Sequence, residues 1–143
     1  MKNQDIIHAR ELLTEDITCV VCKGEDVLTS KDHGVKPLMT WIREGKDFHG
    51  YSAADRVIGR AAAFLYTILG VTEVHAELMS RNGLAVLEKN GINYTYDSLI
   101  DNILNQTKTD LCPMEKLTLQ YEEPQEAYEA LKIKIAELMK NKK

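Results

Sequence analysis

Residues 52–80 read SAADRVIGRAAAFLYTILGVTEVHAELMS, and this stretch decides the fold class. Ser52 followed three residues later by Asp55 predicts a helix start, because both side chains can satisfy free backbone N–H groups of a first turn. Apolar residues at helical spacing continue that helix to about Leu69, and the glycine that follows ends it. From 73 to 79, apolar and polar residues alternate, which predicts a strand. A helix leading into a strand indicates an α/β fold.

The sequence before this stretch predicts a short helix, a β-hairpin and a second helix. Residues 5–14 place apolar side chains at helical spacing. Two β-branched, apolar runs, 17–22 and 27–30, flank a turn that contains a glycine, which is typical of a hairpin. Residues 35–42 have a helical pattern, and Pro37 is compatible with it only in the first turn.

The sequence after residue 80 continues the alternation of helices and strands. Ser80 caps a helix that a glycine closes at residue 91, and residues 92–96 form a short strand. Ser98 repeats the capping pattern and opens a predicted helix to about residue 104. Residues 105–113 have no regular pattern. A final helix is predicted from Pro124, because acidic residues begin it and lysines follow it.

This order of elements predicts a three-layer α/β/α sandwich. Helices that connect strands place those strands parallel and cover both sheet faces, whereas the leading hairpin adds an antiparallel pair. We therefore expect a mixed sheet of about four to five strands with an added C-terminal helix. Since no repeat or linker interrupts the chain, we expect a single domain over 1–143, with a core of about 5–118 and the added helix at about 124–140.

Composition excludes several classes of protein. The 143 residues carry 18 Lys and Arg against 22 Asp and Glu, a net charge of −4, so nothing favours polymeric nucleic acid as a partner. The longest apolar stretch, 61–71, is interrupted and shorter than the ~20 residues of a membrane span. Three cysteines are too few for a disulfide scaffold, and they favour a reducing, cytoplasmic location.

The order of elements also resembles the cytidine deaminase-like fold. In addition, four stretches are similar to the uncharacterised family called domain of unknown function 1893. They are GVKPL (34–38), ADRVIGRAAA (54–63), GVTEV (70–74) and CPME (112–115). The resemblance implies a deaminase-like fold without an established activity, and it supplies no catalytic residues.

Deaminase chemistry requires zinc ligands that this chain does not present in the required context. A zinc deaminase places His or Cys with Glu at one helix start and two Cys at the next, where zinc activates a water. The literal match His75-Ala76-Glu77 falls within the predicted strand. By context, 53–55 and 80–83 correspond to the two motifs, and they offer no thiolate or imidazole. We therefore expect no metal and no cofactor.

The candidate ligand-binding residues lie mainly at the two capped helix starts. Ser52 and Asp55 begin one predicted helix, and Ser80, Arg81 and Asn82 begin the other. Helix N-termini at strand ends are natural anion sites, so these residues are predicted to form the rim of a common cleft. Asp55 is either a helix-capping acid or a carboxylate that binds a base amine or a ribose hydroxyl.

Two further pairs complete the candidate site. Arg56 and Arg60 are four residues apart, which predicts a shared helix face. Either a neighbouring carboxylate, simple solvation or a phosphate-bearing ligand would offset their repulsion. Cys112 and Glu115 belong to the CPME stretch, which is either a structural turn or carries a reactive thiol.

Other polar groups are interpreted structurally. Glu73, His75 and Glu77 share one face of their strand, which favours an exposed or edge face over a metal site. Cys19 and Cys22 have CxxC spacing, but on a strand they point to opposite faces.

Three functional hypotheses follow. The first is a zinc-less deaminase-like domain that binds a nucleotide or similar small metabolite without deaminating it. The second is an enzyme of another class, transferase-like, that uses Asp55, Ser80 or Cys112. The third is a module for protein interaction or homo-oligomerisation through the C-terminal helix or the hairpin edge. Fold alone does not rank them.

Overall fold

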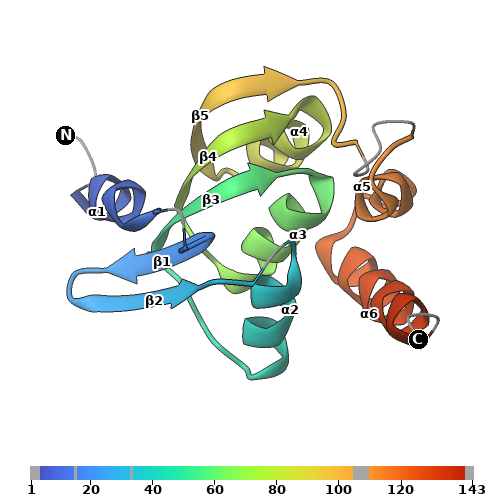
Figure 1. The fold of residues 1–143 in the computed structure, drawn as a ribbon, viewed down its shortest axis with the longest axis horizontal. Coiled ribbons are helices and arrows are strands. Elements are labelled where there is room, and N and C mark those ends of the chain that lie inside the picture. The colour runs from blue at the N-terminus through green and yellow to red at the C-terminus, as the bar shows by residue number, and fades with distance from the viewer. Residues whose placement is uncertain (1–3, 15, 33, 105–109, 141–143) are drawn as a thin grey trace.

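The chain folds around a single five-stranded sheet, seen in a computed structural model that describes residues 4–14, 16–32, 34–104 and 110–140 (Figure 1). The strands are β1 (Cys19–Lys23), β2 (Asp26–Ser30), β3 (Ser52–Ile58), β4 (Glu73–Ser80) and β5 (Asn93–Ile100). The helices are α1 (Gln4–Leu12), α2 (Lys36–Arg43), α3 (Arg60–Leu69), α4 (Arg81–Lys89), α5 (Pro113–Thr118) and α6 (Pro124–Lys140).

The sheet is mixed, as predicted, with the strand order β2-β1-β3-β4-β5. The hairpin strands β1 and β2 pair antiparallel, and β1 also pairs antiparallel with β3. The pairs β3–β4 and β4–β5 are parallel. Because α3 and α4 connect the parallel strands, the carboxyl ends of β3, β4 and β5 all lie at the same edge of the sheet, where ligands usually bind.

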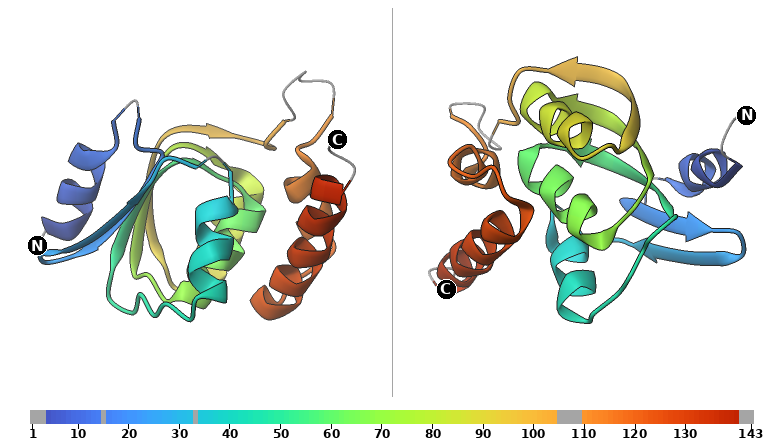
Figure 2. Two further views of the ribbon diagram at one scale, coloured as in Figure 1. Left: turned by 60° about the horizontal axis from the view of Figure 1, so that its bottom comes forward. Right: turned by 180° about the vertical axis from the view of Figure 1, so that it is seen from behind.

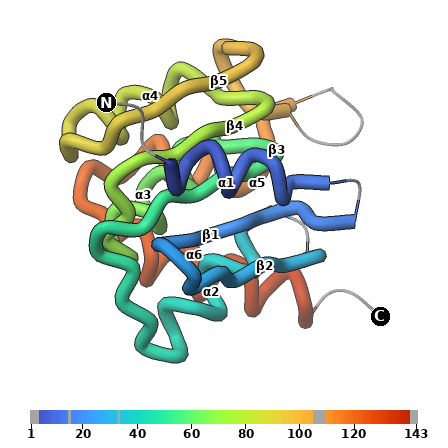
Figure 3. Tube along the Cα trace, turned by 90° about the vertical axis from the view of Figure 1, so that its left-hand side faces the viewer, coloured from blue at the N-terminus to red at the C-terminus, as the bar shows by residue number. Residues whose placement is uncertain are grey.

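Helices cover both faces of the sheet, which confirms the three-layer prediction. Helix α1 packs on one face against β1, β3 and β4, while α2, α3 and α4 lie on the other face (Figures 2 and 3). Helices α5 and α6 pack against α3 from outside, so they extend the sandwich on that side (Figure 2). The predicted C-terminal helix is therefore confirmed, and it covers the helical layer rather than the sheet.

Two apolar cores lie on the two sides of the sheet. The larger core fills the space between the sheet and α2, α3 and α4, with Phe64 and Tyr66 among its fully buried side chains. The smaller one lies under α1 and is centred on Ala9. Cys19 belongs to the larger core and Cys22 to the smaller one, so the prediction that they point to opposite faces is confirmed.

The first correction concerns residues 52–58, which form strand β3 and not the start of a helix. These residues pair with β1 on one side and β4 on the other, and Ala53 and Ala54 are fully buried there. Small side chains with good helix propensity were thus overridden by tertiary pairing at the centre of the sheet. The helix begins only after Gly59, and it ends as predicted at Gly70, which adopts a left-handed conformation with φ 90°.

The second correction concerns the predicted helix 98–104. Strand β5 continues to Ile100, paired with β4 up to Ser80, and no helix follows within the described part of 98–104. Side chains with high β propensity begin this strand, and the register with β4 carries it past Ser98. Residues 105–109 of the predicted irregular segment lie outside the described residues. Pro113 opens the short helix α5, so CPME is a helix start.

None of the helices among the described residues is long and apolar enough to span a membrane.

Candidate functional site

A cavity of about 100 Å³ lies where strand β3 ends and helices α2 and α3 begin. Its walls come from the start of α2 (Gly34, Val35), the end of β3 (Val57, Gly59), the start of α3 (Ala61, Ala62) and the chain after β5 (Ile103, Cys112, Met114, Glu115). Three of the four stretches that carry the family resemblance therefore meet at one place. Of the predicted site residues, Cys112 and Glu115 line this cavity.

Glu115 is a buried carboxylate that caps helix α3. Only 2% of its surface is exposed. Its Oε1 accepts a hydrogen bond of 2.6 Å from the backbone N–H of Arg60, and its Oε2 accepts one of 2.8 Å from the N–H of Ile103. Because Gly59 precedes the helix and has no side chain, Glu115 supplies the capping oxygen from another segment.

Gly59 permits this close approach. A Cβ atom at Gly59 would lie 2.8 Å from Glu115 Oε1 and 2.8 Å from Ile103 Cγ1, which is shorter than real contacts allow. Gly83 in the first turn of α4 packs equally close, since a Cβ there would lie 2.7 Å from the carbonyl oxygen of Gly59. Two glycines thus bring three segments together behind the cavity.

Arg60 acts as a structural clamp between helix α3 and the segment that follows α5. Its Nε donates a hydrogen bond of 2.8 Å to the carbonyl oxygen of Thr118, and its Nη2 donates one of 2.5 Å to that of Tyr121. The guanidinium also lies 5.0 Å from the ring centroid of Phe64. These contacts satisfy backbone carbonyls near the end of α5 and fasten the segment between α5 and α6 to α3.

Arg56 lies elsewhere, so the prediction that it shares a helix face with Arg60 is wrong. It belongs to strand β3, and its Nη1 donates a hydrogen bond of 2.6 Å to Glu77 Oε2 on β4. Its Nη2 reaches the carbonyl oxygen of Ile17 at 3.3 Å. The two arginines do not share a helix, because helix α3 begins at Arg60, four residues after Arg56.

Ser80 is the N-cap of helix α4, as predicted. Its Oγ accepts a hydrogen bond of 3.0 Å from the N–H of Gly83. The next two residues hold the segment after β5. Arg81 donates to Asp101 at 2.9 Å, and Asn82 donates to Asn102 at 2.7 Å.

Ser52 and Asp55 do not meet Ser80. Ser52 begins β3 and is paired with the first residue of β4, whereas Ser80 ends β4, so the two serines lie at opposite ends of adjacent strands. Asp55 is buried inside the larger core, where Tyr66 Oη donates it a hydrogen bond of 2.7 Å. Cys19 Sγ lies 3.2 Å from the same hydroxyl. The capping role predicted for Asp55 is therefore wrong, since the residue lies within a strand.

The environment of Asp55 changes its titration. Burial raises the pKa of this carboxyl to about 7, although hydrogen bonds from Tyr66 and from the backbone N–H groups of Arg56 and Val57 oppose that shift. Burial also raises the pKa of the Cys19 thiol and the Tyr66 hydroxyl. Asp55, Tyr66 and Cys19 thus form a buried hydrogen-bonded set that favours uncharged side chains.

The described residues do not fit a catalytic zinc ion. By context the sequence placed the two zinc motifs at 53–55 and 80–83. The first placement is wrong, because 53–55 lie within strand β3, whereas 80–83 open helix α4. Neither segment contains the His or Cys ligands that a deaminase zinc requires, and the helix starts Val35-Lys36-Pro37 and Gly59-Arg60-Ala61 contain none either. No three His, Cys, Asp or Glu side chains within the described ranges come together so that they could hold a metal ion. The motif His75-Ala76-Glu77 lies within strand β4, as predicted.

The apolar wall of the cavity was not predicted. Val35, Val57, Ala61 and Ala62 carry no chemical signal of their own, and the assignment of residues 52–58 to a helix hid their position. The usable signal was the resemblance itself, because GVKPL and ADRVIGRAAA contain four of these wall residues.

Comparison with known proteins identifies the family of this chain. The family described as "Domain of unknown function (DUF1893)" matches residues 8–135. The chain belongs to this family. Among solved structures, a DUF1893 family protein from Thermotoga maritima is similar, with 24% sequence identity and a TM-score of 0.85 over 94% of this chain and 92% of that one. No functionally curated protein matches this DUF1893 chain.

Two deaminases are more distant structural neighbours. One is a diaminohydroxyphosphoribosylaminopyrimidine deaminase/5-amino-6-(5-phosphoribosylamino)uracil reductase from Thermotoga maritima, at 14% identity and a TM-score of 0.47 over 82% of this chain and 40% of that one. The other is the dCMP deaminase of cyanophage S-TIM5 in its apo form, at 14% identity and a TM-score of 0.43 over 70% of this chain and all 100% of that one. Both TM-scores are below 0.5, so neither neighbour carries an argument about the fold or the activity of this DUF1893 chain.

Proposed function

We propose that this DUF1893 protein binds a nucleotide or a similar small metabolite in the cavity at the end of β3, and that it does not deaminate this ligand. The observation that carries the proposal is the position of the cavity. It lies outside the carboxyl end of a strand whose neighbours run antiparallel on one side and parallel on the other. Ligands of open α/β sheets bind in the crevice outside the carboxyl ends of the strands.

The walls suit a flat, largely apolar group. Val35 and Val57 face the cavity together with the small residues of the first turn of α3, which leaves room beside the helix. Cys112 and Glu115 add the polar atoms. Glu115 already accepts two backbone hydrogen bonds, yet a carboxylate has about four lone-pair positions, so it can accept a further bond from a ligand amine.

The size of the cavity limits what it can enclose. Its volume of about 100 Å³ is below the ~300 Å³ at which pockets enclose a drug-sized ligand. A heterocyclic ring such as a nucleobase is the part of a nucleotide that we expect inside it. The sugar and phosphate would remain outside, near the exposed Lys36 at the start of α2.

A melting screen tests this function. Free bases, nucleosides and nucleotides are added singly, and we expect at least one to raise the melting temperature of the protein, because a ligand that binds only the folded state stabilises it. The variant Val57→Phe fills the cavity from its exposed rim and should lose the shift. Ile133→Phe, a similar enlargement of an exposed side chain on α6, should retain it.

The deaminase part of the proposal has its own readout. Each ligand that binds is incubated with the protein and added zinc, and ammonium release is measured. We expect none, because the helix starts beside the cavity provide no zinc ligand set. Ammonium release by the wild-type protein, and not by Val57→Phe, would show that the site is catalytic.

The three residues named for the transferase-like alternative lie in different surroundings and share no hydrogen bond among the described residues. Asp55 is buried under Tyr66, and Ser80 is engaged as a helix cap. Of the three nucleophile candidates, Cys112 alone is half-buried at the cavity. If a turnover is found, its survival in both Cys112→Ser and Asp55→Asn would exclude this alternative.

Interaction through α6 is a second candidate, because apolar side chains are exposed on this helix. Ile133 is 65% exposed and Met139 is 69% exposed. Such residues are typical of contact surfaces when they lie close together. A cytoplasmic location is part of the proposal as well, supported by three free cysteines. Polymeric nucleic acid remains an unexpected partner at a net charge of −4.

A further inference from the structure

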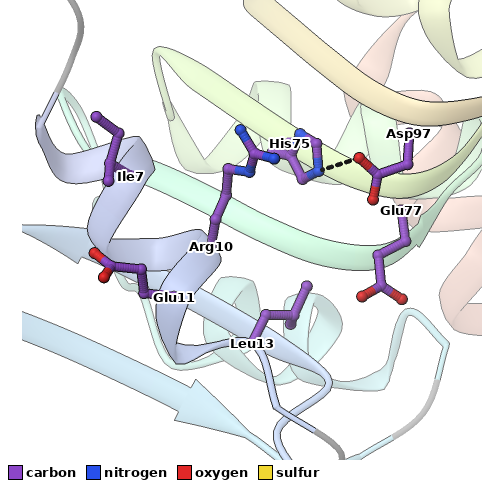
Figure 4. A pocket seen from close by; sticks show the side chains of 7 residues that line it. All are labelled: Ile7, Arg10, Glu11, Leu13, His75, Glu77 and Asp97. Atoms are coloured by element: carbon purple, nitrogen blue, oxygen red, sulfur yellow. Dashed lines mark ion pairs between the residues drawn. The ribbon is translucent and has the colours of Figure 1, made fainter.

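A second, larger cavity lies on the opposite face of the sheet, between helix α1 and strands β4 and β5 (Figure 4). Helix α1 packs against β1, β3 and β4 but leaves the outer part of this face uncovered (Figure 3). The cavity has a volume of about 310 Å³, which lies at the lower end of the range for small-molecule sites.

The sheet wall of this cavity is acidic. Glu77 on β4 and Asp97 on β5 lie beside each other in the parallel register and line the cavity with His75. The Glu77 carboxylate is paired with Arg56, at 2.6 Å. Asp97 Oδ1 lies 3.4 Å from His75 Nε2 (Figure 4).

His75 is held in place by a hydrogen bond, and its surroundings favour the uncharged ring. Its ring has a hydrogen bond of 2.7 Å between Nδ1 and the hydroxyl of Thr95. Burial, and then the positive charge of Arg10, lower the pKa of this imidazole, although Asp97 and Glu77 oppose the shift. The lowered pKa favours the neutral imidazole, and within the described ranges Asp97 forms no ion pair with a lysine or an arginine.

The helix wall presents one cation that is not neutralised. Arg10, in the last turn of α1, extends across the cavity toward His75 (Figure 4). It forms no ion pair with any described residue, although Glu77 and Asp97 line the same cavity. Ile7 and Leu13 of the same wall add apolar surface, and Glu11 adds a further negative charge.

We propose that this cavity binds a small zwitterion, of which the free α-amino acids are the simplest class. The carboxylate of the ligand pairs with the Arg10 guanidinium, which suits that group in bidentate geometry. The ammonium group lies against Asp97 and Glu77, and the hydrocarbon part lies against Ile7 and Leu13. Glu11, Glu77 and Asp97 together disfavour polyanions such as nucleotides, so this ligand differs from the one proposed for the β3 cavity.

Calorimetric titration of the full chain with the free L-amino acids tests the proposal. At least one is expected to bind. Its N-acetyl and C-terminal amide derivatives each lack one charge, and their affinity is expected to be lower by about tenfold or more. The Val57→Phe variant, which blocks the other cavity, should bind the amino acid like the wild type. This arm separates a failure here from a failure of the function proposed above.

Variants of the two walls complete the test. Arg10→Gln and Asp97→Asn should each weaken binding of the amino acid by about tenfold or more. Arg10 and Asp97 are exposed, so the melting temperatures should show that both variants remain folded. Arg43→Gln is the matched control, because Arg43 is also exposed in the last turn of its helix, α2. The proposal is overturned if no amino acid binds at millimolar concentration, if either derivative binds equally well, or if Arg10→Gln has no effect.

Discussion

At the scale of single residues, Asp55 gives the protein a defined pH dependence. Its pKa is about 7 in the folded protein because of burial, against an ordinary value of 3.8. A raised acid pKa means that the folded state holds the proton more tightly, so the stabilising contribution of Asp55 is fully present below pH ~4 and is lost as the pH rises through 7. The part of the free energy of unfolding lost across this window is of the order of 4 kcal/mol.

Asp55→Asn should remove this loss, because an amide cannot ionise and its oxygen can still accept the Tyr66 hydrogen bond. We expect the stability difference between variant and wild type to grow in favour of the variant from pH 4.5 to 7.5, measured by urea denaturation at each pH. Asp16→Asn, an exposed control, should follow the wild type. Parallel pH profiles for Asp55→Asn and the wild type would show that Asp55 is not the titrating group.

At Gly59, packing and not backbone conformation excludes any side chain. Its φ of −102° suits any residue, so an alanine there is strained only by the contacts of its Cβ with Glu115 and Ile103. We expect Gly59→Ala to lower the free energy of unfolding by about 1–3 kcal/mol. Thermal unfolding is the measurement, and Gly91→Ala, which meets no atom within 4 Å but has φ 72°, isolates the backbone cost. Wild-type stability of Gly59→Ala would contradict the close packing at the cavity.

At the scale of elements, Arg60 joins the C-terminal helices to the sandwich. A lysine in its place cannot donate to the carbonyl oxygens of Thr118 and Tyr121 in the same geometry. Arg60→Lys should therefore cost about 1.5–3 kcal/mol, the range for hydrogen bonds with a charged partner, and should speed proteolysis within residues 113–140. Arg56→Lys is the control, since its partly exposed ion pair with Glu77 contributes ~1 kcal/mol or less. Equal effects of both variants would contradict the role of Arg60 as a structural clamp.

The elements also show what the sequence could predict. The hairpin, the helix with Pro37 in its first turn, the cap at Ser80 and the final helix were predictable, because each depends on local signals. Strand β3 was not, because Ser52-Ala53-Ala54-Asp55 is a capping pattern whose strand conformation depends on pairing with β1 and β4. Because of that single error, the sequence analysis paired Arg56 with Arg60 and not with its partner Glu77, and it did not identify Val57 as part of the cavity wall.

At the scale of the whole molecule, the candidate site depends on long-range contacts that no local pattern encodes. Cys112 and Glu115 reach the cavity only because α5 folds back over the start of α3, 55 residues away along the chain. The resemblance to the family identified these stretches without showing that they meet. A single domain over 1–143 and a possible homo-oligomer remain predictions.

Amide hydrogen exchange of the whole molecule distinguishes an open sheet edge from a covered one. Strand β3 is central and largely buried, whereas most residues of β5 are exposed and its outer edge pairs with no described strand. We expect exchange to be slowest in β3, β4 and α3 and markedly faster in β5, because opening at an edge exposes few apolar contacts. Protection of β5 equal to that of β3 would contradict an open edge. It would indicate that β5 is covered, because an unpaired strand edge readily pairs with another chain. Sedimentation at the same protein concentration would then show whether a second copy covers β5.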